Sequence, residues 1–244
     1  MNFLFDLPQP KLDKKIRLIT FFSGIGAQEK AMENLGVDFE IYKAIEFDKY
    51  AIASYNAIRG TDFPTTDICD VHGKDLKIVD KDKYNYVLFY SWPCTSLSVA
   101  GKMEGMKEGS GTASSLLFEV KRIFTELSDD ELPDILCWEN VPQVHSEQNM
   151  PELRKWLEYL TFRGYKTYYE DLNAKDFGIP QNRERCFGVS ILSKEFVEFE
   201  FPKKIPLKYV MKDFLQTDVD EKYFIRSEKA DKLIEQLIKD GKLD

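Results

Sequence analysis

Short apolar runs alternate with amphipathic stretches along most of the chain. From residue 16 onward, most runs of strand length are followed by a segment whose apolar residues recur at helical spacing. The runs predict strands at 16–22, 39–47, 84–90, 134–140, 166–174 and 186–192, with a possible further strand ending near Asp67. The spaced segments predict helices at 27–35, 48–58, 114–127 and 151–164, and a charged amphipathic helix over 227–244.

This order of elements predicts an α/β protein with a mostly parallel sheet and helices on both faces. Asp48 is expected to cap the helix that it precedes, because its carboxylate can accept hydrogen bonds from the free N–H groups of a first turn. Ligands of such sheets bind beyond the carboxyl ends of the strands. The residues that directly follow the strands are therefore the first candidates for function.

The composition is typical of a soluble globular protein. Apolar residues occupy 43% of the 244 positions and charged residues 31%, and no stretch approaches the roughly 18 apolar residues that span a bilayer. The N-terminus lacks the basic start and apolar run of a secretory signal, so we expect a cytoplasmic protein without membrane contact. The net charge of −8 argues against nonspecific coating of nucleic acid but permits a local basic groove.

Cysteine usage argues against a metal site or a disulfide framework. The four cysteines are Cys69, Cys94, Cys137 and Cys186. They form no C-x-x-C pair, and the chain has only two histidines, so we expect no bound metal. Three of them have apolar or strand neighbours, as small buried side chains do. Cys94 differs, because it follows Pro93 in a loop of small polar residues just after the strand at 84–90.

Two segments near the N-terminus suggest a ligand site. Residues 21–29, FFSGIGAQE, give a strand end, a glycine turn and a helix start, where backbone N–H groups can approach a ligand closely. The segment lacks the full G-x-G-x-x-G pattern, and a plain tight turn fits it equally well. Glu46 ends the next strand, where an acid can accept hydrogen bonds from ribose hydroxyls, although a solvated loop acid is the simpler interpretation. Asp67 could accept from an amino group of a purine-like ring.

Charged residues also follow the later strands. Glu139 closes the apolar strand at 134–140, a position at which an acid is commonly functional, although it could simply cap the next segment. Arg183 and Arg185 lie two residues apart after Pro180, so their side chains point the same way if the backbone is extended. The two arginines could hold a phosphate or a carboxylate, or form a charged edge.

Taken together, these motifs resemble the DNA (cytosine-5)-methyltransferase family from Arg17 to about Phe214. FFSGIG resembles its first S-adenosylmethionine motif, EFD its acidic cofactor motif, and TTDI its adenine-contacting segment. PCTSLSVAGK resembles the Pro-Cys nucleophile loop, ENV the catalytic glutamate motif, and QNRER the Gln-x-Arg-x-Arg motif. Each motif is weak alone, but their occurrence in the family's order makes the resemblance specific.

The resemblance implies a Rossmann-like fold that binds S-adenosylmethionine and transfers its methyl group to C5 of a flipped-out cytosine in double-stranded DNA. Cys94 would add to C6 of the ring as a thiolate, and Glu139 would hold and protonate the ring near N3. Arg183 and Arg185 would fix the base carbonyl and the glutamate. The base that removes the C5 proton is not identified by the sequence.

The resemblance also assigns residues outside the reacting centre. Ser98 and Lys102 would position the nucleophile loop or contact DNA phosphates. The residues implied in cofactor binding are Phe22, Gly24, Gly26, Glu46, Phe47, Asp67, Ile68, Trp92 and Pro93. The chain departs from the family's pattern at Thr20, where an aspartate is usual, and at Thr95, which replaces a glutamine and could alter how the loop holds DNA.

The family's target-recognition domain, a support motif and a late Gly-Asn-Ser motif have no counterpart in the chain. We therefore expect a leader at 1–14, a catalytic domain at 15–200, and a connection at 201–244 toward an absent recognition domain. The chain would be a truncated or split enzyme of prokaryotic or phage origin, and a second polypeptide could supply sequence recognition. The target sequence and the biological role stay open.

Two alternatives remain at this point. The chain could be a catalytically silent relative that binds DNA or a partner as a regulator, although the joint presence of Cys94, Glu139 and Arg185 argues against that reading. It could also be an RNA cytosine-5 methyltransferase with the same cysteine loop, because 2′-hydroxyl recognition would lie largely in the absent part.

Overall fold

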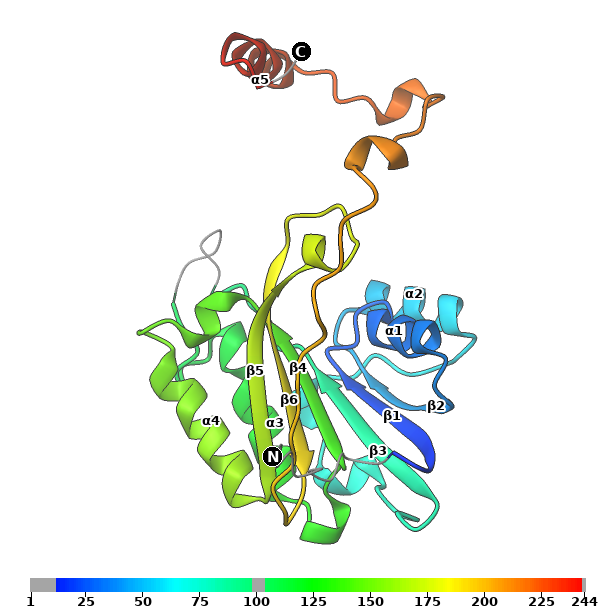
Figure 1. Ribbon diagram of the computed structural model, residues 1–244, viewed down its shortest axis with the longest axis vertical. Coiled ribbons are helices and arrows are strands. Elements are labelled where there is room, and N and C mark those ends of the chain that lie inside the picture. Colours follow the sequence, from blue (N-terminus) through cyan, green and yellow to red (C-terminus); the bar gives the residue numbers. More distant parts are fainter. Residues whose placement is uncertain (1–11, 98–103, 243–244) are drawn as a thin grey trace, which may run out of the picture.

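Six strands form one sheet in the order β2-β1-β3-β4-β6-β5 (Figure 1). The computed structural model describes residues 12–97 and 104–242. The strands are β1 (Lys15–Phe21), β2 (Phe39–Ile45), β3 (Tyr84–Tyr90), β4 (Ile135–Asn140), β5 (Tyr165–Asn173) and β6 (Glu184–Leu192). β2, β1, β3 and β4 pair in parallel, whereas β6 is antiparallel to both β4 and β5. The predicted mostly parallel sheet is confirmed, because β6 alone among these six strands runs against the others.

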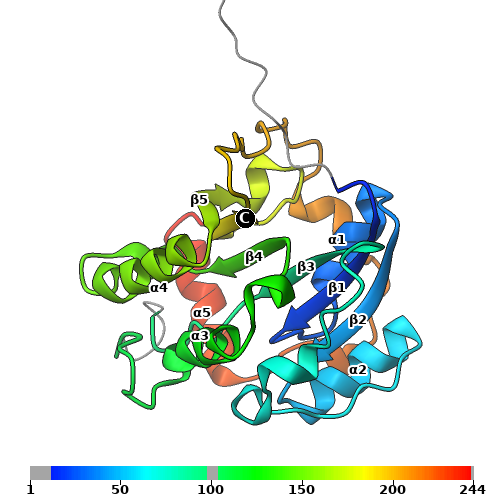
Figure 2. The same ribbon diagram turned by 90° about the horizontal axis from the view of Figure 1, so that it is seen from below.

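Helices cover both faces of the sheet (Figure 2). Met32 of α1 packs on one face with Ile16 and Leu18 of β1. α3 and α4 cover the opposite face, where the rings of Phe124 and Trp156 meet edge to face in the main core. The helices are α1 (Ala27–Leu35), α2 (Lys49–Arg59), α3 (Leu117–Thr125), α4 (Met150–Phe162) and α5 (Glu228–Lys239). The predicted α/β fold is therefore present.

Burial on both faces explains why the central strands have unbroken apolar sequences. Leu18 of β1 packs toward α1, whereas Ile19 and Phe21 join the main core on the other face. Parallel strands that are covered by helices on both sides have this composition, because successive side chains point to opposite faces. Burying each such side chain contributes about 1.5–3 kcal/mol.

The structure bears out the predicted cap of α2 and corrects the region around Asp67. The Asp48 carboxylate accepts hydrogen bonds from two backbone N–H groups of the first turn of α2, at 2.7 and 2.9 Å. The predicted strand that ends near Asp67 is wrong. Asp67 instead accepts from the backbone N–H of Cys69 and begins the short 3-10 helix Ile68–Asp70. A local bond between an aspartate side chain and a nearby N–H competes with strand pairing, and here it prevails.

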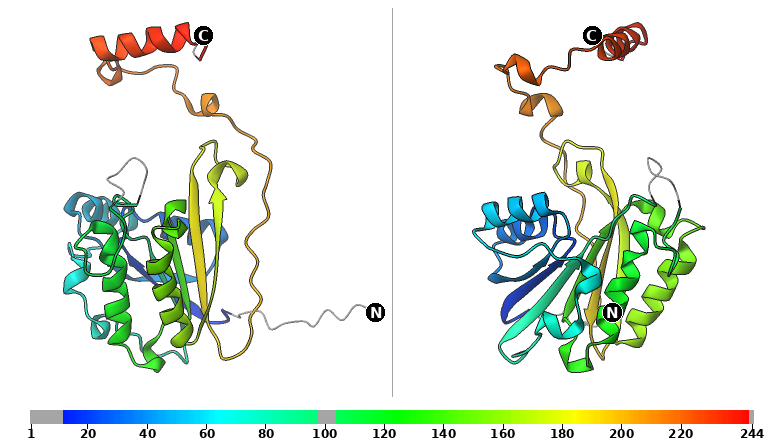
Figure 3. Two further views of the ribbon diagram at one scale, coloured as in Figure 1. Left: turned by 90° about the vertical axis from the view of Figure 1, so that its left-hand side faces the viewer. Right: turned by 180° about the vertical axis from the view of Figure 1, so that it is seen from behind.

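After β6 the chain passes along the sheet and then extends as an arm to α5 (Figure 3). The arm is held at its start, where Lys204 Nζ lies 2.8 Å from Asp176 and Ile205 bridges to Phe177. The predicted C-terminal helix is present as α5, and none of its residues is buried. Its exposed apolar residues are Leu233, Ile234 and Ile238. No helix within residues 12–97 and 104–242 has the length and apolar character that crossing a bilayer requires.

Gly188 of β6 allows the strand to lie directly against a tryptophan of β4. A Cβ at Gly188 would lie 1.9 Å from Trp138 Cε2, far inside van der Waals contact. We expect Gly188→Ala to lower the free energy of unfolding by about 3 kcal/mol or more, because the buried ring and the paired strand cannot both move aside. Urea denaturation measures the loss, with Glu184→Ala on an exposed position of the same strand as control. Equal midpoints for the two variants would contradict this expectation.

Candidate active site

The turn that follows β1 lies at the carboxyl edge of the sheet. Phe22, Gly24 and Gly26 all have left-handed backbone conformations, with φ of 56°, 56° and 87°. This conformation is unfavourable for phenylalanine and persists only where the surroundings enforce it. The backbone N–H of Gly24 donates to the Glu46 carboxylate at 2.8 Å. The turn after β1 and the end of β2 are thus joined directly.

Glu46 connects this turn to the start of α2. Its two carboxylate oxygens accept from the backbone N–H groups of Gly24 and Asp48, each at 2.8 Å. A carboxylate offers about four acceptor sites, so Glu46 can also accept from a ligand hydroxyl. Phe47 is 70% exposed and available to stack on an aromatic ring. A Cβ at Gly24 would meet nothing within 4 Å. Open space beside an acid and an exposed ring fits an adenosine-containing cofactor.

Of the other residues predicted to bind the cofactor, two are buried in the core and two are partly exposed. Ile68 is 3% exposed and Trp92 2%, and both side chains belong to the main hydrophobic core. The Trp92 ring stacks on Tyr90 with a centroid separation of 5.9 Å. The buried side chains of Ile68 and Trp92 therefore support the partly exposed residues next to them in the chain. Asp67 precedes Ile68 and Pro93 follows Trp92, and both are partly exposed.

Cys94 begins a tight turn directly after β3. The backbone N–H of Leu97 donates to the Cys94 carbonyl at 2.9 Å. Ser114 Oγ donates to the Pro93 carbonyl at 2.7 Å and accepts from the Ser96 N–H at 3.3 Å. Cys94 is partly exposed and packs against the edge of the main core. Hydrogen bonds on both sides therefore hold the backbone that carries this thiol.

The other three cysteines are poorly suited to nucleophilic chemistry. Burial raises the pKa of Cys137 to about 12 and raises the pKa of Cys186 far above its usual range. Cys69 is exposed, unlike the buried cysteine that its sequence context predicts, but partial desolvation and the Asp67 carboxylate raise its pKa to about 11. The thiolate is the reactive form of cysteine, so these three thiols are held in the unreactive form near neutral pH.

Glu139 at the end of β4 faces two arginines. Arg185 Nε lies 3.0 Å from Glu139 Oε1, and Arg183 Nη2 lies 4.0 Å from the same atom. The expectation that these arginines point the same way is confirmed. Ser91, three residues before Cys94, also hydrogen-bonds the Glu139 carboxylate. Glu139, the two arginines and the loop that carries Cys94 therefore lie together at the carboxyl edge of the sheet.

The pKa of Glu139 is raised above its ordinary value. Desolvation by burial is the largest cause, and it outweighs the attraction of Arg185 and Arg183 and the hydrogen bond from Ser91, which lower the pKa. A raised pKa increases the protonated fraction of this carboxyl group near neutral pH. That protonation state suits a group that delivers a proton to a ring nitrogen.

Replacement of Glu139 by glutamine is expected to favour the folded state more strongly as the pH rises. A carboxyl group whose pKa is higher in the folded state contributes stability below its unfolded pKa and loses it as the pH rises through the folded pKa. Glutamine does not ionise and avoids that loss. The melting temperature of Glu139→Gln relative to wild type should therefore be higher at about pH 8 than at about pH 4. A difference that does not change with pH, or that matches exposed Glu184→Gln, would contradict the raised pKa.

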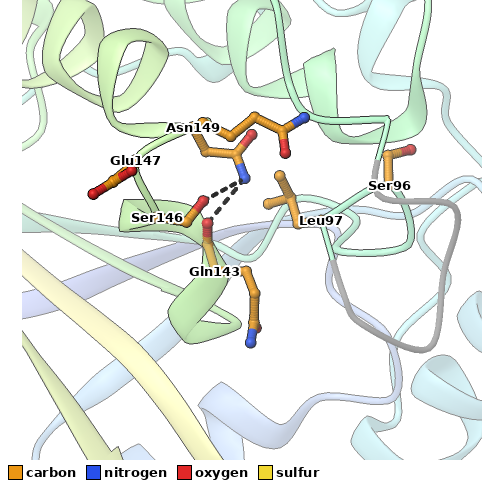
Figure 4. A pocket seen from close by; sticks show the side chains of 7 residues that line it. Ser96, Leu97, Gln143, Ser146, Glu147 and Asn149 are labelled. Carbon is orange, nitrogen blue, oxygen red and sulfur yellow. Dashed lines mark hydrogen bonds between the residues drawn. The ribbon is translucent and has the colours of Figure 1, made fainter.

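A pocket of about 400 Å³ borders the loop that follows Cys94 (Figure 4). Asn149 Nδ2 donates to the Gln143 carbonyl at 2.9 Å and to Ser146 Oγ at 3.1 Å, which fixes one wall. The pocket is bounded by the segments that follow Cys94 and Glu139, although neither of these two residues lines it. Its lining residues are Ser96, Leu97, Gln143, Ser146, Glu147, Gln148 and Asn149.

Asn140 links the segments that carry Cys94 and Glu139, and the sequence reasoning missed it. Its Nδ2 donates to the Trp92 carbonyl at 3.0 Å, and its Oδ1 accepts from the Val141 N–H at 2.9 Å. The signal was a polar residue at the end of an apolar strand, but its cross-strand partner is visible only in the structure. The predicted loop residues Ser98 and Lys102 lie outside the described residues.

One cluster in the described parts of the chain has the donor types of a metal site. The ligand atoms of His145, Asp171 and Cys186 lie within 4.8 Å of one another. His145 Nε2 is 2.9 Å from Asp171 Oδ2, so these two side chains already pair with each other. Burial raises the pKa of Cys186, which disfavours the thiolate that a metal needs. A hydrogen-bonded His–Asp pair over a buried thiol accounts for this cluster, and the absence of a metal stays a prediction.

Comparison with known proteins agrees with this geometry. The family model for C-5 cytosine-specific DNA methylases matches residues 16–241. Type II methyltransferase M2.ScrFI of Lactococcus lactis subsp. cremoris is 40% identical over 155 residues, which cover 63% of this chain and 42% of the relative. Type II methyltransferase M.NlaX of Neisseria lactamica is 34% identical over 214 residues, which cover 86% of this chain and 62% of the relative. The chain therefore spans less than two thirds of the length of either relative.

Solved structures share the fold. The S. pombe Dnmt2 methyltransferase superposes with a TM-score of 0.68 at 21% identity, covering 91% of this chain and 66% of that one. The Entamoeba histolytica methyltransferase EhMeth gives a TM-score of 0.68 at 20% identity, covering 88% of this chain and 64% of that one. At such identities the likeness concerns the fold alone, and it confirms the predicted Rossmann-like methyltransferase architecture.

Proposed function

Because the chain belongs to the C-5 cytosine-specific DNA methylase family, we propose that it takes part in methyl transfer to C5 of cytosine in double-stranded DNA. The methyl donor of this family is S-adenosylmethionine. The observation that best supports the proposal is the Glu139–Arg185 pair, which lies beside the Cys94 loop at the carboxyl edge of the sheet. The names of the related type II methyltransferases favour DNA as substrate.

The turn at 22–26 and the end of β2 suit the cofactor. We assign the turn to the methionine and adenosine parts, Glu46 to the ribose hydroxyls, Phe47 to stacking near adenine, and Asp67 to the adenine amino group. Pro93 would close the wall next to the nucleophile, with the buried residues beneath it as support. When bound there, S-adenosylmethionine supplies an electrophilic methyl group.

Cys94 and Glu139 would activate the base. C5 of cytosine is a poor nucleophile, and addition of the Cys94 thiolate to C6 converts the ring into an enamine that can accept a methyl group at C5. Glu139 donates a proton at N3 and so offsets the negative charge that the addition brings to the ring. Arg185 holds Glu139 in place, and Arg183 is near enough to hold the base carbonyl. Once the methyl group has passed to C5 and the donor has left as its thioether, a base takes the C5 proton and the thiolate is eliminated. Return of the N3 proton to Glu139 then restores the aromatic ring and the free enzyme.

The target base has to leave the duplex to reach these residues, at a cost of a few kcal/mol of stacking and pairing. We assign groups near the extruded base to the pocket lined by Ser96 and Gln143, because it is bounded by the segments that follow Cys94 and Glu139. Ser98 and Lys102 stay predicted contacts of the loop with DNA. The division into a leader at 1–14 and a catalytic domain at 15–200 is likewise a proposal.

The arm that begins at residue 201 has a feature that favours a binding partner. Its helix α5 has no buried residue, so the exposed apolar side chains of α5 have no cover within the described chain. We propose that a second polypeptide, or a further domain, packs on this arm and supplies recognition of the DNA sequence. The −8 net charge is consistent with a basic DNA-reading surface that lies elsewhere.

Methyl-labelled S-adenosylmethionine, incubated with the full chain and mixed-sequence DNA, tests the proposal. Nucleoside analysis should find the label in 5-methylcytosine. An identical RNA panel runs in parallel, and label in RNA alone would replace the DNA assignment with the RNA alternative. Cofactor binding without any label, also in the presence of a co-expressed partner, would favour the catalytically silent relative.

A further inference from the structure

A buried acid lies behind the turn at 22–26. Glu29, in the first turn of α1, has an exposed fraction of 0%. Its Oε1 accepts from the Tyr55 hydroxyl at 2.7 Å and from Thr20 Oγ1 at 3.2 Å, whereas its buried Oε2 has no hydrogen-bond partner among the described residues. Burying a carboxylate that is only partly satisfied costs free energy, so its position needs an explanation beyond packing.

Arg59, the last residue of α2, reaches the same place from the other side. Its side chain is 8% exposed, and its Nη1 lies 2.6 Å from Glu33 Oε1. Its Nη2 donates to the backbone carbonyl of Gly26 at 2.5 Å, while its buried Nε has no hydrogen-bond partner within residues 12–97 and 104–242. The Arg59 guanidinium group therefore holds the end of the turn through a hydrogen bond to the Gly26 backbone.

Gly26 lies between these two charged groups. A Cβ at this position would be 2.8 Å from Arg59 Nε, 3.1 Å from Glu29 Oε2 and 3.2 Å from the Tyr55 ring. Gly26 also has a φ of 87°, which favours glycine. Side chains from two helices thus enclose one peptide unit of the turn.

The arrangement links both cofactor segments through α2. The first turn of α2 follows Glu46, whose carboxylate accepts from the Gly24 N–H. Later in α2, Arg59 holds the Gly26 carbonyl, and Tyr55 holds Glu29 in the first turn of α1, directly after the turn. The turn is therefore fixed at Gly24 by one strand end and at Gly26 by one helix. A backbone turn that contains left-handed residues needs such restraint to keep a single shape.

We propose that Glu29, Tyr55 and Arg59 are positioning residues that set the affinity for S-adenosylmethionine. They fix the turn at 22–26 in its binding conformation before the ligand arrives, so binding does not have to order it. This inference rests on the proposed function, because it takes that turn as the cofactor site. Arg59 acts through the Gly26 carbonyl, whereas Tyr55 and Glu29 act through the start of α1 and the end of β1, and none of the three touches the reacting atoms.

Tyr55→Phe tests the inference, because it removes one hydroxyl and keeps the ring. The expected result is a rise of about tenfold in the dissociation constant and the KM for S-adenosylmethionine, with kcat at saturating cofactor nearly unchanged. Glu29→Gln should act in the same direction, because glutamine keeps the shape and loses the charge beside Arg59. Isothermal titration calorimetry on the full chain gives the affinity without requiring turnover.

Tyr165→Phe is the matched control. Tyr165 is likewise 0% exposed, and its hydroxyl donates to the Pro133 carbonyl at 2.7 Å at the opposite end of the sheet. It should lose comparable thermal stability and keep wild-type cofactor affinity. Wild-type affinity in both Tyr55→Phe and Glu29→Gln, or equal weakening in Tyr165→Phe, would overturn the inference and leave the proposed function standing. A wild-type chain that binds no S-adenosylmethionine would instead remove the proposed function and the inference together.

Discussion

Cys94→Ser is expected to lower the rate of methyl transfer by a factor of about a thousand or more. The proposed addition to C6 needs a thiolate, and a serine hydroxyl is far less acidic and less nucleophilic at neutral pH. The substitution exchanges sulfur for oxygen at a partly exposed position, so the fold should be retained. Incorporation of label from S-adenosylmethionine into DNA measures the effect, and an unchanged cofactor affinity would show that the binding turn is intact.

Cys69→Ser is the matched control for this experiment. Cys69 is also exposed, but desolvation and the Asp67 carboxylate raise its pKa to about 11. This variant should keep wild-type activity. DNA that contains 5-fluorocytosine gives a second readout, because fluorine at C5 prevents the proton loss that releases the enzyme. A covalent complex that survives a denaturing gel in wild type and is absent in Cys94→Ser would support the adduct. Substantial activity in Cys94→Ser would disprove the assignment of Cys94 as nucleophile.

Glu139→Gln is expected to lower the rate by a factor of about a hundred or more. Glutamine can still hydrogen-bond N3 of the ring, but it has no acidic proton to give, so negative charge accumulates on the base as the thiolate adds. The loss should appear in kcat, whereas the affinity for S-adenosylmethionine, which binds at a different turn, should remain. Single-turnover labelling of DNA separates these two effects.

The stability of Glu139→Gln shows whether its loss of activity comes from lost chemistry or from unfolding. The raised pKa of Glu139 predicts that the stability of Glu139→Gln relative to wild type improves as the pH rises. A variant that folds well and transfers no methyl group would locate the defect in the chemistry. Activity within a few-fold of wild type would instead show that Arg185 and Arg183 alone offset the charge on the ring.

The local elements were predictable because local patterns produce them. The burial of β1 on both faces follows from its apolar run, and Asp48 caps α2 through neighbouring N–H groups. Asp67 shows the limit of such reasoning. Its side chain bonds the N–H of Cys69, and this local bond diverts the chain into a 3-10 helix where the flanking residues suggested a strand.

The sequence predicted those residues of the candidate site that lie at the end of a strand. Cys94 and Glu139 each follow an apolar strand, and in a parallel sheet those ends meet at the same edge. Asn140 was not predictable, because its partner is the Trp92 carbonyl, 48 positions away in the sequence. Burial of the Trp92 ring likewise depends on its packing with Tyr90 and the rest of the core.

By itself, the sequence determined the α/β class, the family, and the residue types on which the proposed cysteine-based methyl transfer depends, because these follow from short-range patterns and motifs. Only the tertiary structure decided which of these side chains meet. The position of β6 between β4 and β5 brings Arg185 to Glu139, and the packing of α2 on α1 brings Tyr55 to Glu29 across 26 positions. Contacts between distant segments depend on how whole elements pack, and no local pattern encodes that.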